Sequence, residues 1–193
     1  MPFRADSERL ASCSYDGTVL VWDTGDPSRP APLARLRHRR LVNGAAWHPA
    51  DPALLATASA DKTVAVWRIP EDGGHSLVSV LARHTDDVNA VAWMPDGRRL
   101  VCVSEDGRAM PWDAGTGALI AEIGAHTAHC MMVAVNRDGL VATVGEDGGS
   151  RSANRAARTS PTSCTTRRRS RAAPGRTRGR SWPSPATTAW STS

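Results

Sequence analysis

Residues 59–68 read SADKTVAVWR, and residues 14–23 and 104–113 repeat that pattern as SYDGTVLVWD and SEDGRAMPWD. The aspartate and the tryptophan of these segments each recur every 45 residues. Repetition at a fixed period of about 20–50 residues is typical of a chain built from one small unit used several times. The sequence is therefore predicted to fold as a repeat array.

A second register runs through the same units. Three of the units have a histidine nine residues before a tryptophan or a valine, and the pairs are His38 and Trp47, His84 and Trp93, and His126 and Val135. Residues 144–148, VGEDG, begin the motif a fourth time. Because two registers recur together in successive units, the repeat is not a chance similarity.

Within a unit the pattern is that of β structure. Residues 90–93 and 100–104 are apolar runs of strand length, and an Asp-Gly turn at 94–97 joins them. A third strand is predicted to end at Trp112, and a fourth to cover residues 118–123. Four short strands joined by Gly and Asp turns predict one antiparallel sheet per unit.

These units resemble WD40 repeats, with a histidine near the start, an aspartate turn and a closing Trp-Asp. The resemblance covers about residues 1–148. It implies a propeller, a ring of such sheets that docks proteins on its faces and rim. The expected fold is all-β: an incomplete propeller of about three to four antiparallel four-stranded blades, followed by a disordered tail. The expected units are a partial blade at 1–36, blades at 37–81 and 82–123, a partial blade at 124–148 and the tail at 149–193.

The resemblance also implies a buried polar network in each unit, in which a turn carboxylate holds an imidazole, the imidazole bonds a strand hydroxyl, and the hydroxyl accepts an indole N–H. Its members would be Ser12, Asp16 and Trp22; His38, Thr57, Asp61 and Trp67; His84, Cys102, Asp106 and Trp112; and His126, Thr143 and Asp147. Cys102 is expected to weaken its copy, since a thiol is a poor donor and acceptor. The fourth copy has alanine at position 153, where tryptophan is expected.

The same residue types could be interpreted as a hydrolase triad, Cys102–His84–Asp106 above all. A triad is needed once, in a cleft with an exposed nucleophile, whereas this constellation recurs in every unit. Repetition favours a structural role, so the sequence predicts no enzyme, no cofactor, no metal site and no small-molecule substrate. His48, His75 and His129 are expected to be ordinary loop or surface residues.

The partner surface is expected on residues that flank the network, because WD40 proteins often bind partners there. Mapped onto this chain, they are Tyr15, Leu41, Asn43, Ala60, Asp87, Asn89, Glu105, His129, Met131 and Glu146. The alternative is that each is only a solvated loop residue. Three carboxylates in the set favour a basic or polar protein partner, which the sequence does not identify.

Charge divides the chain sharply. All 19 Asp and Glu residues precede Gly148, and the 45 residues from Gly149 contain ten Arg and no Leu, Ile, Val, Phe or Met. Such a segment buries too little apolar surface to offset ordering and is expected to be disordered. One interpretation is a basic tail that binds nucleic acid. The favoured one is a shifted reading frame in a chain of bacterial type, which leaves a propeller fragment.

The remaining features suggest a cytoplasmic protein. Four cysteines without metal-type spacing favour reduced thiols, and neither a signal sequence nor a membrane-length apolar run is present in the sequence. Because so few blades leave apolar faces open, self-association through the open blade edges is expected.

Overall fold

A computed structural model describes residues 2–6, 8–124 and 126–153, and within these ranges every regular element is a β-strand. The first sheet consists of β1 (Arg9–Cys13), β2 (Thr18–Asp23) and β3 (Ala31–Arg37). The second consists of β4 (Val42–Trp47), β5 (Leu54–Ser59), β6 (Thr63–Arg68) and β7 (Ser76–Ala82). The third consists of β8 (Val88–Trp93), β9 (Arg99–Ser104), β10 (Arg108–Asp113) and β11 (Ile123–Gly124). The fourth consists of β12 (Cys130–Val135), β13 (Val141–Gly145) and β14 (Ser150–Ala153).

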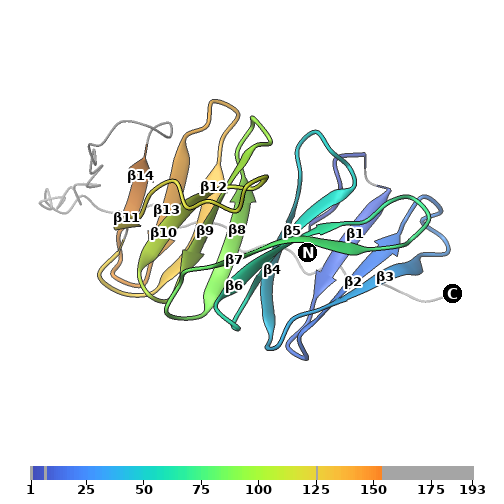
Figure 1. The fold of residues 1–193 in the computed structure, drawn as a ribbon, viewed down its shortest axis with the longest axis horizontal. Coiled ribbons are helices and arrows are strands. Elements are labelled where there is room, and N and C mark those ends of the chain that lie inside the picture. Colours follow the sequence, from blue (N-terminus) through green and yellow to red (C-terminus); the bar gives the residue numbers. More distant parts are fainter. Residues whose placement is uncertain (1, 7, 125, 154–193) are drawn as a thin grey trace, which may run out of the picture.

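The four sheets stand side by side in chain order, from β1–β3 at one end of the row to β12–β14 at the other (Figure 1). Strands β4, β8 and β12, which open their sheets, contact one another in sequence, as blades do around a propeller axis. The row is open, with the first and last sheets at opposite ends. The predicted fold class, an all-β incomplete propeller, is confirmed.

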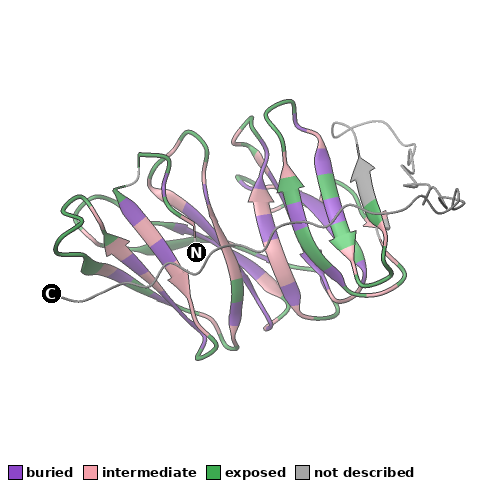
Figure 2. Ribbon diagram, turned by 180° about the vertical axis from the view of Figure 1, so that it is seen from behind, coloured by how far each residue is buried: buried purple, intermediate pink, exposed green. Residues whose placement is uncertain are grey.

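The core lies between the sheets. Successive side chains point to opposite faces of a sheet, so burial alternates along outer strands such as β3, whereas β5, β6, β9 and β10 are buried on both faces (Figure 2). One apolar cluster joins the first and second sheets around Val21 and Leu55, a second joins the second and third around Val66 and Leu100, and a third joins the third and fourth. Each sheet is therefore stabilised by its neighbours, as in other repeat proteins.

Equivalent tight turns connect β1 to β2, β5 to β6 and β9 to β10. Gly17 and Gly107 adopt positive φ angles of 83° and 79°, and Lys62 adopts 73° at the matching position of the second sheet. The strained backbone at Lys62 is accompanied by a hydrogen bond from its ammonium to the carbonyl of Thr85, 2.6 Å away. The turns thus keep one geometry even where glycine is absent.

The fourth strand of the third sheet differs from the prediction. Residues 118–123 were expected to form it, but β11 covers only Ile123–Gly124, with an isolated bridge between Trp112 and Leu119. The carbonyl of Pro111 points toward residues 118–123 and accepts a hydrogen bond from the Ile120 N–H. A backbone N–H at position 111 would point the same way, but proline has none. The ladder is interrupted because β10 cannot donate there.

The expected break at Gly149 is also corrected. Residues 150–153 form β14, which pairs with β13 from Val141–Ala153 to Val144–Ser150. Backbone hydrogen bonds make this pairing, and they need no apolar side chain. Residues 154–193, which hold most of the predicted disordered tail, lie outside the described part of the chain.

Candidate functional site

The second sheet contains a complete polar network. His38 Nδ1 lies 3.0 Å from Asp61 Oδ2, and His38 Nε2 lies 2.7 Å from Thr57 Oγ1. The indole of Trp67 donates to the same hydroxyl oxygen at 2.9 Å. These side chains come from the loop before β4, from β5, from the β5–β6 turn and from β6, which the antiparallel register brings together.

The direction of each bond follows from the donors. Burial raises the pKa of the Asp61 carboxyl, but hydrogen bonds from Thr63, from the Arg39 backbone and from His38 outweigh this and leave the pKa below its ordinary value. An ionised carboxylate only accepts, so His38 carries a proton on Nδ1. The Trp67 indole only donates, which leaves the Thr57 hydroxyl proton for His38 Nε2 or for the Ala65 carbonyl, 3.3 Å away. Every polar group of the network is thereby satisfied.

The third sheet repeats the network with sulfur in place of oxygen. His84 Nδ1 lies 2.9 Å from Asp106 Oδ2, and His84 Nε2 lies 3.1 Å from Cys102 Sγ. The buried indole nitrogen of Trp112 makes no hydrogen bond of good geometry among the described residues, although the indole acts on the Cys102 thiol as a weak donor would and opposes the rise of its pKa. Burial raises the pKa of the Cys102 thiol to about 12, so the thiol keeps its proton at neutral pH. All four residues of this copy are in place, but the hydrogen bonding of the indole is incomplete.

The first sheet keeps part of the network. Trp22 donates to Ser12 Oγ at 2.9 Å, and Asp16 accepts from the backbone and hydroxyl of Thr18. Asp16 therefore closes its turn without a histidine.

The fourth sheet has the imidazole pair without the indole. His126 lies 2.9 Å from Asp147 Oδ1 and 3.0 Å from Thr143 Oγ1. A Cβ on Gly145 would come within 2.6 Å of the His126 ring, so glycine is required beside this imidazole. The bond from His126 is the largest cause of the lowered pKa of Asp147.

The chemistry open to these groups is limited by their burial. Thr57 and Cys102 are fully buried, and the side chains of His38, His84 and His126 are almost entirely covered. A nucleophile must reach its substrate, and a protonated thiol is a poor nucleophile. The geometry fits hydrogen bonding between strands. Within the described ranges, moreover, His, Cys, Asp and Glu form no cluster that could hold a metal ion.

The residues predicted to face a partner are placed unequally. Tyr15 is 84% exposed, and the other exposed members are Asn43, His129, Met131 and Glu146. Half-buried members are Leu41, Asp87, Asn89 and Glu105. Ala60 must be corrected, because it is 0% exposed and its side chain cannot reach a partner. The turn that contains Ala60 is held against Leu41, because the Ala60 N–H donates a hydrogen bond to the Leu41 carbonyl.

Two members of that set connect sheets. Asn43 donates to the carbonyl of Val88 at 3.0 Å, and Asn89, at the matching position of the next unit, donates to the carbonyl of Cys130 at 3.1 Å. Each asparagine therefore joins its own sheet to the first strand of the following one. Asparagine at the fifth position after the histidine was a sequence signal for this role.

Other contacts between sheets were missed by sequence reasoning. Arg9, although buried, donates to the carbonyls of Ile69 and Pro70 and to Glu71, which joins the first sheet to the second. His48, expected to be an ordinary loop or surface residue, bonds the carbonyl of Gly97 at 2.8 Å and packs edge-on against Trp93. Neither pairing has a short spacing in sequence, so no local pattern could have indicated it.

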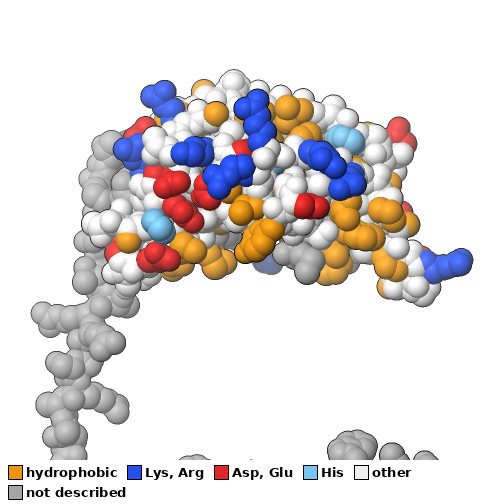
Figure 3. All heavy atoms as spheres, turned by 90° about the horizontal axis from the view of Figure 1, so that it is seen from below, with side chains coloured by type: hydrophobic (Ala, Val, Ile, Leu, Met, Phe, Trp, Pro, Cys, Tyr) orange, Lys and Arg blue, Asp and Glu red, His pale blue; other side chains and the backbone are white. Residues whose placement is uncertain are grey.

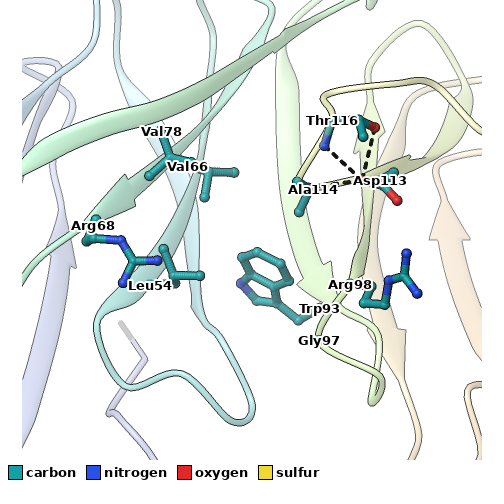
Figure 4. Close-up of a pocket in the computed structure, with 11 residues that line it drawn as sticks. Leu54, Val66, Arg68, Val78, Trp93, Gly97, Arg98, Asp113, Ala114 and Thr116 are labelled. Atoms are coloured by element: carbon teal, nitrogen blue, oxygen red, sulfur yellow. Dashed lines mark hydrogen bonds between the residues drawn. The ribbon is translucent and has the colours of Figure 1, made fainter.

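A shallow cleft opens where the second and third sheets diverge. Figure 4 shows Leu54, Val66 and Val78 on one side and Trp93 on the other, with Asp113 and Thr116 hydrogen-bonded to each other at its edge. Its volume is about 390 Å³. The polar groups at the cleft do not converge on a common point in the view, and Asp113 is already satisfied by the turn that follows it.

Comparison with known proteins agrees with this geometry. Residues 35–137, more than half of the chain, match the family described as anaphase-promoting complex subunit 4 WD40 domain, and residues 2–23 match the WD domain, G-beta repeat. Similar curated proteins include nuclear distribution protein PAC1 of Komagataella phaffii, 25% identical over 141 residues that make up 67% of this chain and 28% of the relative. The probable cytosolic iron-sulfur protein assembly protein Ciao1 of Culex quinquefasciatus is 42% identical over 81 residues, 42% of this chain and 24% of the relative.

A probable coatomer subunit beta' of Schizosaccharomyces pombe is 31% identical over 145 residues, 75% of this chain and 18% of the relative. The chain thus spans a quarter or so of the length of the curated relatives it matches. These relatives are eukaryotic and lend no support to the expected bacterial origin or to the shifted frame, which remain predictions. Repeat spacing, sheet geometry and family matches agree, and the chain belongs to the WD40-repeat family.

Proposed function

We propose that this chain is a non-catalytic scaffold that binds a protein partner through the exposed residues beside the polar network. One observation carries the proposal. The groups that could perform chemistry are buried and bonded to one another, whereas Tyr15 and Glu146, each next to a network aspartate in sequence, are exposed. The buried network holds the turns in place, and the exposed neighbours are free to make contacts.

The exposed set has the composition of a binding surface. Tyr15 is a large, nearly uncovered aromatic side chain, and tyrosine is enriched among the residues that dominate binding energy. On the fourth sheet, His129 Nδ1 lies 3.3 Å from Glu146 Oε2, near the exposed Met131. Met131 adds an adaptable apolar contact. Together these residues offer an aromatic, an apolar and a polar contact.

Charge favours a polar rather than a strongly basic partner. Asp87 is paired with Arg40 at 3.2 Å, and Glu146 is paired with His129, so two of the three predicted carboxylates already have partners. The face seen from below in Figure 3 carries acidic and basic side chains intermixed. A surface of mixed sign steers partners weakly and leaves specificity to shape and hydrogen bonds.

The test is a comparison of captured proteins. We would immobilise the full chain, the double variant Tyr15→Ser/Met131→Ser and the control Leu77→Ser, which changes an exposed apolar residue of β7. A partner of the proposed surface is retained by wild type and control, and is lost by the double variant. Retention of every specific partner by the double variant would contradict the proposal.

Two further parts of the proposal concern the setting of the chain. We propose a cytoplasmic protein, because Cys13, Cys102 and Cys130 are all free thiols in the described ranges. The four sheets are proposed to be part of a larger propeller, since a ring of this kind closes with about four to eight blades and the row here is open. The described residues contain no helix able to cross a membrane.

A further inference from the structure

The packing between sheets follows one rule, so the missing neighbours of the end sheets can be described. We call the face that a sheet turns toward the following sheet its forward face, and the opposite one its rear face. In the second sheet, Ala56 and Ala58 lie on the forward face and are fully buried. The third sheet places Val101 and Val103 at the same positions, and they are buried under the fourth sheet. These central positions of a forward face are thus fully covered in both sheets.

No sheet of the described residues packs on the forward face of the fourth sheet. Val144 occupies the position of Val103 and is 44% exposed, where Val103 is 0% exposed. Across the ladder it pairs with Met132, which is also exposed, and the next pair on this face is Ala134 and Ala142. Four apolar side chains therefore line an open sheet face without a charged residue among them.

The rear face of the first sheet is open in a complementary way. Phe3 occupies the position of Trp47 and Trp93, which pack against the preceding sheet and are 9% and 8% exposed. Phe3 is 58% exposed. Behind it, Leu10 and Trp22 form the cross-strand pair that matches Leu55 and Trp67, and they are only half-buried, whereas Leu55 is fully covered. No sheet of the described residues covers this face.

We propose that a second copy of this chain covers these faces, with the rear face of one first sheet packed on the forward face of the other copy's fourth sheet. Contacts between neighbouring sheets of one chain indicate how the two copies would pack. The indole of Trp93 donates to the carbonyl of Ala46 in the preceding sheet, at 3.0 Å. Ala134 matches Ala46 by its spacing from the histidine, so Phe3 of one copy packs over Ala134 of the other.

Two such contacts close a ring. A head-to-tail interface joins different surfaces of the two copies. Such interfaces form a closed ring when the rotation that relates one copy to the next leads back to the first copy. Two copies of four sheets contain eight, which lies within the range of about four to eight blades found in propellers. The inference rests on the proposal that the four sheets belong to a larger propeller, and it is independent of the partner surface around Tyr15.

The first experiment measures the mass of the full chain, 20.5 kDa, by light scattering across a concentration series. A particle of twice that mass is expected. Val144→Asp should raise the dissociation constant by roughly a hundredfold or more, because it places an unpaired carboxylate in an apolar interface. Val80→Asp is the matched control, since Val80 is 50% exposed on β7 and away from both faces, and it should leave the dimer intact. A monomeric wild-type chain at all concentrations would overturn the inference.

The second experiment tests the head-to-tail arrangement. Phe3→Asp should dissociate the dimer as Val144→Asp does, although the two positions lie at opposite ends of the row. Mixing the two variants leaves one of the two interfaces with wild-type faces, so weak dimers should reappear. A Phe3→Asp chain that remains dimeric, or a mixture without recovery, would overturn the arrangement. Because both side chains are exposed in the single chain, circular dichroism should show both variants folded. Partner capture through Tyr15 is scored separately, so either proposal can fail alone.

Discussion

Replacing Cys102 with threonine should repair the network of the third sheet, because it puts a hydroxyl in place of the thiol. In the second sheet, Thr57 accepts the indole N–H of Trp67 at 2.9 Å and lies 2.7 Å from its imidazole. In the third sheet, the thiol of Cys102 takes that place and the indole nitrogen of Trp112 makes no hydrogen bond of good geometry among the described residues. Cys102→Thr would place a hydroxyl at a position where the fold already accommodates one, since Thr57 is fully buried at its own site.

The expected gain follows from the orphaned donor. A buried polar group without a partner costs about 1–3 kcal/mol, and a neutral hydrogen bond contributes about 1 kcal/mol net. Cys102→Thr should therefore raise the free energy of unfolding by about 1–2 kcal/mol. The reverse change, Thr57→Cys, removes the acceptor of Trp67 and should lower it by a similar amount.

Urea unfolding followed by tryptophan fluorescence measures these differences. The control is Cys13→Thr, because Cys13 is a half-buried free thiol outside any network, and its effect should stay within about 0.5 kcal/mol. The double variant Thr57→Cys/Cys102→Thr should return near wild-type stability, since the two sites lie in different sheets. The reasoning is refuted if Cys102→Thr destabilises the chain while Thr57→Cys leaves its stability unchanged.

Three further outcomes test other parts of the structure. Because the pKa of Asp61 is lowered in the folded chain, its ionised form stabilises the fold above about pH 3.9, the pKa of an unfolded aspartate. This stabilisation should be lost as the pH falls through the lower folded pKa. The melting temperature of Asp61→Asn should therefore depend less steeply on acid pH than that of the wild type. Gly145→Ala should lower the free energy of unfolding by about 1–3 kcal/mol, because the new Cβ meets the His126 ring at 2.6 Å. Gly115→Ala is the control and should change stability little, since its Cβ lies 3.5 Å from the nearest atom. Equal effects of the two substitutions in urea unfolding would contradict this cause. Asn89→Ala removes the hydrogen bond to Cys130 and should lower stability by about 1 kcal/mol, with faster amide exchange in β12; unchanged exchange would show that the bond does not hold the third and fourth sheets together.

Much of the fold could be predicted from spacing alone. The period of 45 residues and the Asp and Gly turns predicted about three to four antiparallel sheets, because strand length and turn chemistry are local properties. Prediction failed for residues 118–123, where Pro111 on the neighbouring strand removes a donor, and for β14, where backbone pairing continues through a stretch without aliphatic side chains. Both errors arose because a strand also depends on the backbone of its partner.

The candidate site, like the fold, could be predicted from the sequence only in part. Members of one network lie within about 30 residues of each other in a single sheet, so the repeat period places them together by register. The predicted partner surface depends on how far each side chain is covered, and sequence spacing could not distinguish the buried Ala60 from the exposed Tyr15.

By itself, the sequence determined the sheets, their order and the partners within each network, because these depend on distances along one chain that repeat with every unit. Only the tertiary structure decided which sheet faces are covered, which residues besides Asn43 and Asn89 join neighbouring sheets and which side chains remain exposed. Contacts such as Arg9 with Glu71 and His48 with Gly97 join residues 62 and 49 positions apart and depend on how two sheets pack against each other. These particular pairings arise where two faces meet, and the spacing within one unit does not encode them.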